Sequence, residues 1–175
     1  MDTIEKAKKI RLVIFDVDGV LTNGALIYGQ NGSEYKEFHV HDGFGLRMLQ
    51  KSGVQIAIIT AKNSEIVAQR AKDLKIQHVY QGQENKIPAF EDLKTKLQLS
   101  DEEIAYVGDD LPDLPLIRRV GLGVTVANAP AIMQQYAAWI TKAKGGKGAA
   151  REVCDLIMEA QGSYQAMVKS YIEGR

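Results

Sequence analysis

The chain contains 175 residues, of which 45% are hydrophobic and 25% are charged, as is usual for a globular domain with a buried core. Lysine plus arginine equals aspartate plus glutamate, at 22 each, so the net charge gives no reason to expect a nucleic-acid or membrane partner. The single cysteine, Cys154, excludes an intrachain disulfide, and its apolar neighbours predict a core thiol. The segment from Met1 to Lys9 is polar and charged, and no apolar run approaches the roughly 18 residues of a membrane span, so we expect a cytoplasmic protein.

The first predicted element is a short buried strand over the apolar run Leu12–Phe15. Asp16 and Asp18 follow it, and Gly19 allows a sharp turn. Alternate residues of a strand face the same way, so we expect both carboxylates at one mouth, at the carboxyl end where open α/β sheets place their sites. Two close carboxylates need either a divalent cation, for which Mg²⁺ suits oxygen ligands, or a proton on one of them. Both states suit phosphoryl transfer, whereas the alternative is a solvated turn with two acidic residues.

A hairpin is predicted next, over about residues 24–40. The segment Gly29-Gln30-Asn31-Gly32 separates two β-prone runs, at 25–28 and 34–38, and Asn-Gly is a strong hairpin signal. Because the hairpin follows the acidic pair directly, it is a candidate flap over the site. A plain surface hairpin is the alternative.

The rest of the chain alternates predicted helices and strands. Asp42 is the expected N-cap of a helix that ends at Gly53, and further helices are expected at 64–74, 85–97, 114–120, 130–136 and 148–161. Strands are expected at 54–60, 78–80, 104–107, 123–126 and 138–140, and a polar tail at about 162–175. This alternation predicts an α/β fold with a doubly wound parallel sheet in a single domain, residues 1–175.

Two isolated polar residues are weaker candidates for the same site. Thr60 ends the second predicted strand, where its hydroxyl could hydrogen-bond a phosphoryl oxygen. Lys86 stands at a predicted helix start and could contact both a phosphate and an attacking aspartate. Threonine is common in strands and caps, and a lone helix lysine is usually exposed, so neither residue is specific by itself.

The run 105–113 carries the second strong signal, because a predicted strand enters Gly108 and then three acids. Asp109 at the strand end could complete the oxygen shell of a metal ion. Asp110 and Asp113 could hold its waters or orient Lys86. Their alternative role is to cap the following helix.

A glycine-rich basic block at 145–153 precedes the last predicted helix. Its glycines allow backbone amides to approach an anion, and the helix start adds a positive dipole end. Lys147 and Arg151 add charge. A flexible loop before a surface helix explains the same residues equally well.

Taken together, these motifs resemble a known family. The pattern DxDGVLT at 16–22, Thr60, Lys86 and GDDxxD at 108–113 occur in the order found in the haloacid dehalogenase-like phosphohydrolases. The run 81–86, Gln-Gly-Gln-x-Asn-Lys, and the GGxGAxRE segment at 145–152 are similar to the 3-deoxy-D-manno-octulosonate 8-phosphate (KDO 8-phosphate) phosphatases of that superfamily.

The resemblance implies an Mg²⁺-dependent phosphomonoesterase that converts KDO 8-phosphate to KDO and phosphate in lipopolysaccharide precursor biosynthesis. It implies that Asp16 attacks phosphorus to form an aspartyl phosphate and that Asp18 acts as acid and then base. Asp16, the Asp18 backbone carbonyl and Asp109 would hold Mg²⁺, while Thr60 and Lys86 would hold the phosphoryl oxygens.

The same resemblance implies a substrate-binding set and an assembly. The candidates for the substrate carboxylate and hydroxyls are Lys62, Arg70, Lys147 and Arg151. The sequence leaves no room for the cap domain of larger relatives, so a neighbouring subunit would cover the site in a homotetramer with its hairpins packed together.

Two departures keep another sugar-acid phosphate open as the substrate. Ala61-Lys62 stands where related phosphatases usually have Gly-Arg, and lysine lacks the two-pronged contact of arginine with a carboxylate. His41 stands where arginine is frequent. The rival from another class is a phospho-receiver signalling domain, which also uses acids, Thr or Ser, Lys and Mg²⁺. Receivers place the acidic pair first and the phosphorylated aspartate later, the opposite of the order here.

Overall fold

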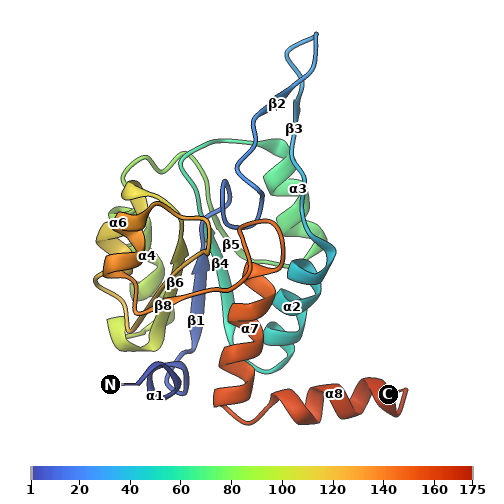
Figure 1. The fold of residues 1–175 in the computed structure, drawn as a ribbon, viewed down its shortest axis with the longest axis vertical. Coiled ribbons are helices and arrows are strands. Elements are labelled where there is room, and N and C mark those ends of the chain that lie inside the picture. Colours follow the sequence, from blue (N-terminus) through green and yellow to red (C-terminus); the bar gives the residue numbers. More distant parts are fainter. Residues whose placement is uncertain (1, 175) are drawn as a thin grey trace.

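The computed structural model describes residues 2–174, and its centre is a six-stranded sheet in the order β5-β4-β1-β6-β7-β8. Every strand pair in this sheet is parallel. The predicted α/β fold with a doubly wound parallel sheet is therefore confirmed (Figure 1). The strands are β1 (Leu12–Phe15), β4 (Gln55–Ile59), β5 (His78–Tyr80), β6 (Ile104–Gly108), β7 (Leu122–Thr125) and β8 (Trp139–Ile140).

Helices cover both faces of the sheet (Figure 1). Right-handed crossovers put the helices that connect β1, β4 and β5 on one face and those that connect β6, β7 and β8 on the other. One face carries α2 (Val40–Lys51), α3 (Glu65–Asp73) and α7 (Ala149–Ala160), and the opposite face carries α4 (Ile87–Leu97), α5 (Leu114–Ile117) and α6 (Ala131–Tyr136). Helix α7 follows the last strand and packs against α2 on the first face. Short 3₁₀ turns lie at η1 (Asp101–Glu103) and η2 (Leu111–Asp113). Because both faces are covered, the central strands are mostly apolar, and all four residues of β1 are buried.

The register of β1 explains where the functional side chains meet. Phe15 pairs with Ile58 of β4 and with Val107 of β6. The residues that follow these strands therefore emerge at one edge of the sheet. The chain leaves β1 toward β5 but leaves β6 toward β8, so this edge is the point where the direction of winding reverses and where ligands bind in open α/β sheets.

The predicted hairpin is present as β2 (Ile27–Tyr28) paired with β3 (Glu34–Tyr35). It projects from the body of the protein at the carboxyl end of the sheet (Figure 1). Only this hairpin lies between the loop after β1 and helix α2. The paired strands are shorter than the β-prone runs of the sequence, because the flanking residues continue as unpaired chain.

Two predictions about helices were wrong. Asp42 does not cap its own helix: α2 begins at Val40 with His39 as N-cap, and Asp42 is a buried residue of the first turn. Its carboxylate instead accepts backbone N–H groups at the start of α7. The expected polar tail forms helix α8 (Tyr164–Ile172) instead, in which Tyr164 and Met167 pack against the core.

Three further features complete the fold. Helix α1 (Thr3–Ala7) was not predicted, because its five residues are too few for a periodic pattern. Cys154 is buried in α7, as expected for a core thiol. None of the helices formed by residues 2–174 has the length and apolar character needed to cross a bilayer.

Candidate active site

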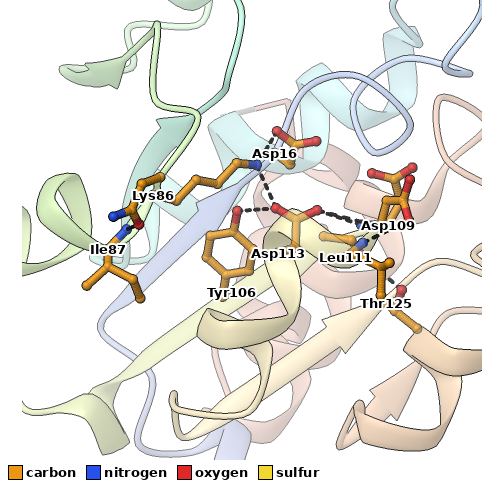
Figure 2. A network of polar contacts seen from close by, with 11 residues as sticks. Asp16, Lys86, Ile87, Tyr106, Asp109, Leu111, Asp113 and Thr125 are labelled. Atoms are coloured by element: carbon orange, nitrogen blue, oxygen red, sulfur yellow. Dashed lines mark hydrogen bonds and ion pairs between the residues drawn. The ribbon is translucent and has the colours of Figure 1, made fainter.

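Asp16 is the first residue after β1 and lies at the centre of the site. Its backbone N–H donates to the Val107 carbonyl at 3.0 Å, which fixes it between β1 and β6. The residue is only 7% exposed. Its Oδ1 accepts a hydrogen bond from the Lys86 ammonium at 2.7 Å, so the carboxylate is both buried and paired (Figure 2).

Lys86 reaches this carboxylate from the N-terminal end of α4. It is 4% exposed, and its Nζ contacts Oδ1 of Asp16 and, at 2.6 Å, Oδ1 of Asp113. Burial lowers the pKa of the Lys86 ammonium, but the charges of Asp16 and Asp113 outweigh burial and raise that pKa above its usual value. Lys86 is therefore a permanent buried cation between two acids, unlike the exposed helix lysine of the alternative interpretation.

Asp113 organises this network. Its Oδ1 accepts from Lys86 and from the Tyr106 hydroxyl, each at 2.6 Å, and its Oδ2 accepts the backbone N–H groups of Asp109 at 3.0 Å and Asp110 at 3.4 Å (Figure 2). Both oxygens are thus occupied by donors of the protein itself. Asp113 therefore holds Lys86 and the loop after β6 in place.

The acidic residues around Asp16 also form a candidate metal centre. Asp16, Asp109 and Asp113 each offer an oxygen, and these atoms lie within 4.8 Å of one another. Burial, followed by the charge of Asp113, raises the pKa of Asp16 to about 6, and burial, followed by the charge of Asp16, raises the pKa of Asp109 to about 7. A divalent cation would remove this repulsion, and an all-oxygen donor set suits Mg²⁺. Because the Asp113 oxygens are already engaged, Asp16 and Asp109 are the carboxylates that fit an ion best.

Asp18 does not join this acidic cluster. Its Oδ1 accepts a hydrogen bond at 2.6 Å from Lys36, which follows the hairpin strand β3 and also contacts Glu34 at 3.0 Å. The Lys36 side chain is 2% exposed. Burial lowers the pKa of Lys36, but its hydrogen bonds to the two acids outweigh burial and raise the pKa. Asp16 and Asp18 thus leave the same strand end with separate lysine partners.

Thr60 directly follows β4, and Asp110 lies in the loop after β6. Thr60 is buried, and its backbone N–H donates to the Tyr80 carbonyl while its own carbonyl accepts from Gln83. These bonds tie the end of β4 to the loop that delivers Lys86. Asp110 caps the 3₁₀ turn η2 by accepting the Leu111 N–H at 2.8 Å, which is the capping alternative noted from the sequence.

The glycine-rich block before α7 is used differently from our expectation. The N–H groups of Gly145, Gly146 and Gly148 donate to Asn128 Oδ1, the Val20 carbonyl and Asp42 Oδ2, respectively. These amides bind protein acceptors, so they are not an open anion cradle. A Cβ at Gly145 would overlap the Gly19 carbonyl oxygen. The glycines therefore allow this block to brace the loop that follows Asp18.

The four basic residues predicted to bind substrate are dispersed around the site. Lys62 is exposed. Arg70 donates to the His39 carbonyl at 3.5 Å, Lys147 pairs with Glu37 at 2.7 Å, and Arg151 pairs with Asp155 at 2.8 Å. Within residues 2–174, none of the four contacts Asp16, Lys86 or Asp113. Their role in substrate binding stays a prediction.

The sequence patterns did not identify the roles of three residues at or near the site. Tyr106 had a detectable signal, because a tyrosine inside an apolar strand needs a partner for its hydroxyl when buried. Asp42 was predicted to cap its own helix, α2, but it accepts N–H groups at the start of α7. Lys36 had no signal, since its burial depends on how the hairpin folds back toward Asp18.

Comparisons with known proteins agree with this geometry. A family model described as haloacid dehalogenase-like hydrolase matches residues 76–153. The chain is 50% identical over 161 residues to the 3-deoxy-D-manno-octulosonate 8-phosphate phosphatase KdsC of Escherichia coli, covering 92% of this chain and 86% of that protein.

Solved structures give the same result. The crystal structure of a probable YrbI family phosphatase from Pseudomonas syringae superposes with a TM-score of 0.97 at 51% identity, covering 99% of both chains. The 3-deoxy-D-manno-octulosonate 8-phosphate phosphatase of Moraxella catarrhalis, solved with magnesium, phosphate and KDO, superposes with a TM-score of 0.95 at 44% identity, covering 97% of both chains. The chain therefore belongs to the haloacid dehalogenase-like hydrolases and, within them, to the family of the 3-deoxy-D-manno-octulosonate 8-phosphate phosphatases.

Proposed function

We propose that this protein is an Mg²⁺-dependent phosphatase that hydrolyses 3-deoxy-D-manno-octulosonate 8-phosphate to KDO and phosphate in lipopolysaccharide precursor biosynthesis. The observation that carries the proposal is the Lys86 ammonium held between Asp16 and Asp113 at 2.7 and 2.6 Å, beside the carboxylate of Asp109. This arrangement combines a buried nucleophile, a fixed cation and oxygen ligands at one point. The proposed substrate is the one that appears in the names of the relatives.

Asp16 is the proposed nucleophile. Its carboxylate attacks phosphorus, and the bond to the sugar oxygen breaks as Asp18 gives that oxygen a proton. An aspartyl phosphate on Asp16 results. Asp18, now a carboxylate, takes a proton from the water that attacks phosphorus next, and phosphate leaves while Asp16 is regenerated.

Lys86 and Thr60 support both steps. The Lys86 ammonium lowers the pKa of Asp16 against the larger effect of burial and offers positive charge to the phosphoryl oxygens, and the Thr60 hydroxyl offers a hydrogen bond. Asp113 positions Lys86, and Asp110 shapes the loop after β6 through its cap.

Magnesium is the proposed cofactor, with Asp16, Asp109 and the backbone carbonyl of Asp18 as the residues that would hold it. When bound, it supplies positive charge to the phosphoryl oxygens and offsets the burial and the mutual repulsion that raise the pKa values of Asp16 and Asp109.

Lys62, Arg70, Lys147 and Arg151 are the proposed contacts of the sugar and its carboxylate. Another sugar-acid phosphate is the second candidate substrate, because the exposed Lys62 offers a point charge where relatives present the fork of arginine.

We also propose that the protein works as a homotetramer in the cytoplasm. The hairpin supports an assembly, because Ile27, Tyr28 and Tyr35 are 45%, 65% and 57% exposed. A cluster of exposed apolar side chains on a projecting element is typical of an interface between proteins. Light scattering after size-exclusion chromatography measures the mass of the assembly.

The test of the activity is phosphate release from KDO 8-phosphate against a panel of sugar phosphates, with Mg²⁺, with EDTA, and with Asp16→Asn. We expect strong preference for the octulosonate ester, lost in both controls. Metal-dependent release spread evenly over the panel would remove the substrate assignment but keep the chemistry. No release from any ester would overturn the proposed function.

A further inference from the structure

Lys36 is the buried link between the hairpin and the loop that carries Asp18. Its side chain is 2% exposed, whereas the residues on either side of it, Tyr35 and Glu37, are exposed. Ordering and burying a lysine costs conformational entropy and desolvation free energy. A buried ion pair seldom recovers much more than that cost. Stability alone therefore gives a weak reason for this contact.

The position of Asp18 gives a stronger reason. Asp18 stands on a loop just before Gly19, whose φ of +98° marks a sharp turn, and not on a strand. A side chain on a loop needs a neighbouring group to fix its orientation. Lys36 holds Oδ1 of Asp18 at 2.6 Å, which leaves the second oxygen, Oδ2, for the reaction.

We infer that Lys36 is a positioning residue for proton transfer by Asp18, and that it aims Oδ2 of Asp18 at the ester oxygen of the substrate. The inference rests on the proposed function, in which Asp18 gives its proton to the leaving sugar oxygen. It also makes the hairpin part of the catalytic machinery, because displacing β3 moves Lys36 and releases the Asp18 carboxylate.

The first test is Lys36→Met, which keeps the length of the side chain but removes its hydrogen-bond donors. We expect kcat for the octulosonate ester to fall by roughly 10- to 100-fold, a part of the 100- to 10,000-fold that general acid–base catalysis supplies. KM should stay unchanged, because the lost interaction matters only in the transition state. Lys36→Arg should restore much of kcat, since arginine keeps a cationic donor.

Glu37→Gln is the matched control. It breaks the other ion pair at the base of the hairpin, between Glu37 and Lys147, whose side chains are 58% and 52% exposed. If Lys36 merely anchored the hairpin, Glu37→Gln would lower kcat to a similar extent. Because Lys147 is a proposed substrate contact, the control compares kcat and not KM: we expect kcat of Glu37→Gln to match that of the unaltered protein. Thermal unfolding confirms that each variant is folded.

A second measurement uses p-nitrophenyl phosphate, whose leaving group departs without a proton. Lys36→Met should lose far less activity on this ester than on the sugar ester. If the unaltered protein does not accept the aryl ester, the kcat and KM values on the sugar ester decide alone.

Two results for Lys36→Met on the sugar ester overturn the inference. A raised KM with unchanged kcat would assign Lys36 to substrate binding, and unchanged activity would remove any role. Absence of phosphate release by the unaltered protein would instead refute the proposed function.

Discussion

The ammonium of Lys86 lies 2.6 Å from Oδ1 of Asp113, and the two side chains are only 3% and 2% exposed. Lys86 lies in the loop after β5, and Asp113 lies in the turn after β6. The two residues therefore stand on opposite sides of the point where the strand order reverses. This contact joins the two halves of the sheet at the site, because the same ammonium also binds Asp16 after β1.

Lys86→Met should remove both activity and stability. Breaking a buried ion pair by deleting one partner costs about 3–5 kcal/mol, because the remaining charges stay buried without compensation. We expect a loss of that size in the free energy of unfolding, measured by urea denaturation, and phosphate release lowered more than about 100-fold. Lys94→Met is the control: Lys94 pairs with Asp101 near the surface, where such a pair contributes about 0–1 kcal/mol. Equal losses in the two variants would contradict this account.

Tyr106→Phe tests the hydroxyl beneath this network. Removing it takes one of two donors from Asp113 Oδ1 while leaving the apolar packing of β6 intact. We expect a loss of about 1–3 kcal/mol in unfolding free energy, because the acceptor stays buried and charged. Tyr80→Phe removes the hydroxyl that donates to exposed Asp92 and should change stability by much less. The prediction fails if both variants unfold at the same urea concentration.

Stability should depend on pH in a direction set by the acidic cluster. The pKa values of Asp16 and Asp109 rise from 3.8 to about 6 and about 7 in the folded protein. Between about pH 4 and pH 7, the folded state therefore binds more protons than the unfolded state. The contribution of Asp16 and Asp109 to the free energy of unfolding consequently falls as pH rises through this range.

Melting temperatures in EDTA at pH 5 and pH 7.5 measure this effect. Asp16→Asn should reduce the difference, because it removes one titrating group. Mg²⁺ should raise the melting temperature chiefly at pH 7.5, where the carboxylates are ionised and binding stabilises the folded state by mass action. An Mg²⁺ effect of the same size at both pH values would argue against a carboxylate site.

Asp42→Ala tests the cap that α2 provides to α7. The carboxylate accepts the N–H of Arg151 at 2.8 Å and of Gly148 at 3.3 Å. Loss of an N-cap side chain costs about 0.5–2 kcal/mol, and we expect the upper part of that range because Asp42 is buried. Asp155→Ala, which removes only the side-chain partner of Arg151, should cost less. Chemical denaturation of the two variants gives the comparison.

The sequence predicted those parts of the site that follow from local pattern. Asp16, Thr60 and Asp109 each end an apolar run, and the parallel sheet brings the ends of such runs together. Lys36 could not be predicted in the same way, because its contact with Asp18 spans a hairpin whose twist is set by tertiary structure. The glycines at 145, 146 and 148 indicated a close approach of the backbone but not its partner: Gly145 and Gly146 approach the loop after β1, and Gly148 donates to the Asp42 carboxylate of α2. Helix α8 was missed because it has no fully buried residue to mark a periodic face.

The hairpin occupies a distinctive place in the chain. Asp16, Thr60 and Asp109 directly follow strands of the layered body, and Lys86 stands at a helix start. The hairpin, in contrast, leaves that body between β1 and α2 and returns to it without joining the large sheet. Its length and the exposed apolar side chains of its strands can therefore diverge without any adjustment of the sheet register. Evolution can change the hairpin while the strand-end residues of the site stay constant, provided that the contact of Lys36 with Asp18 is kept.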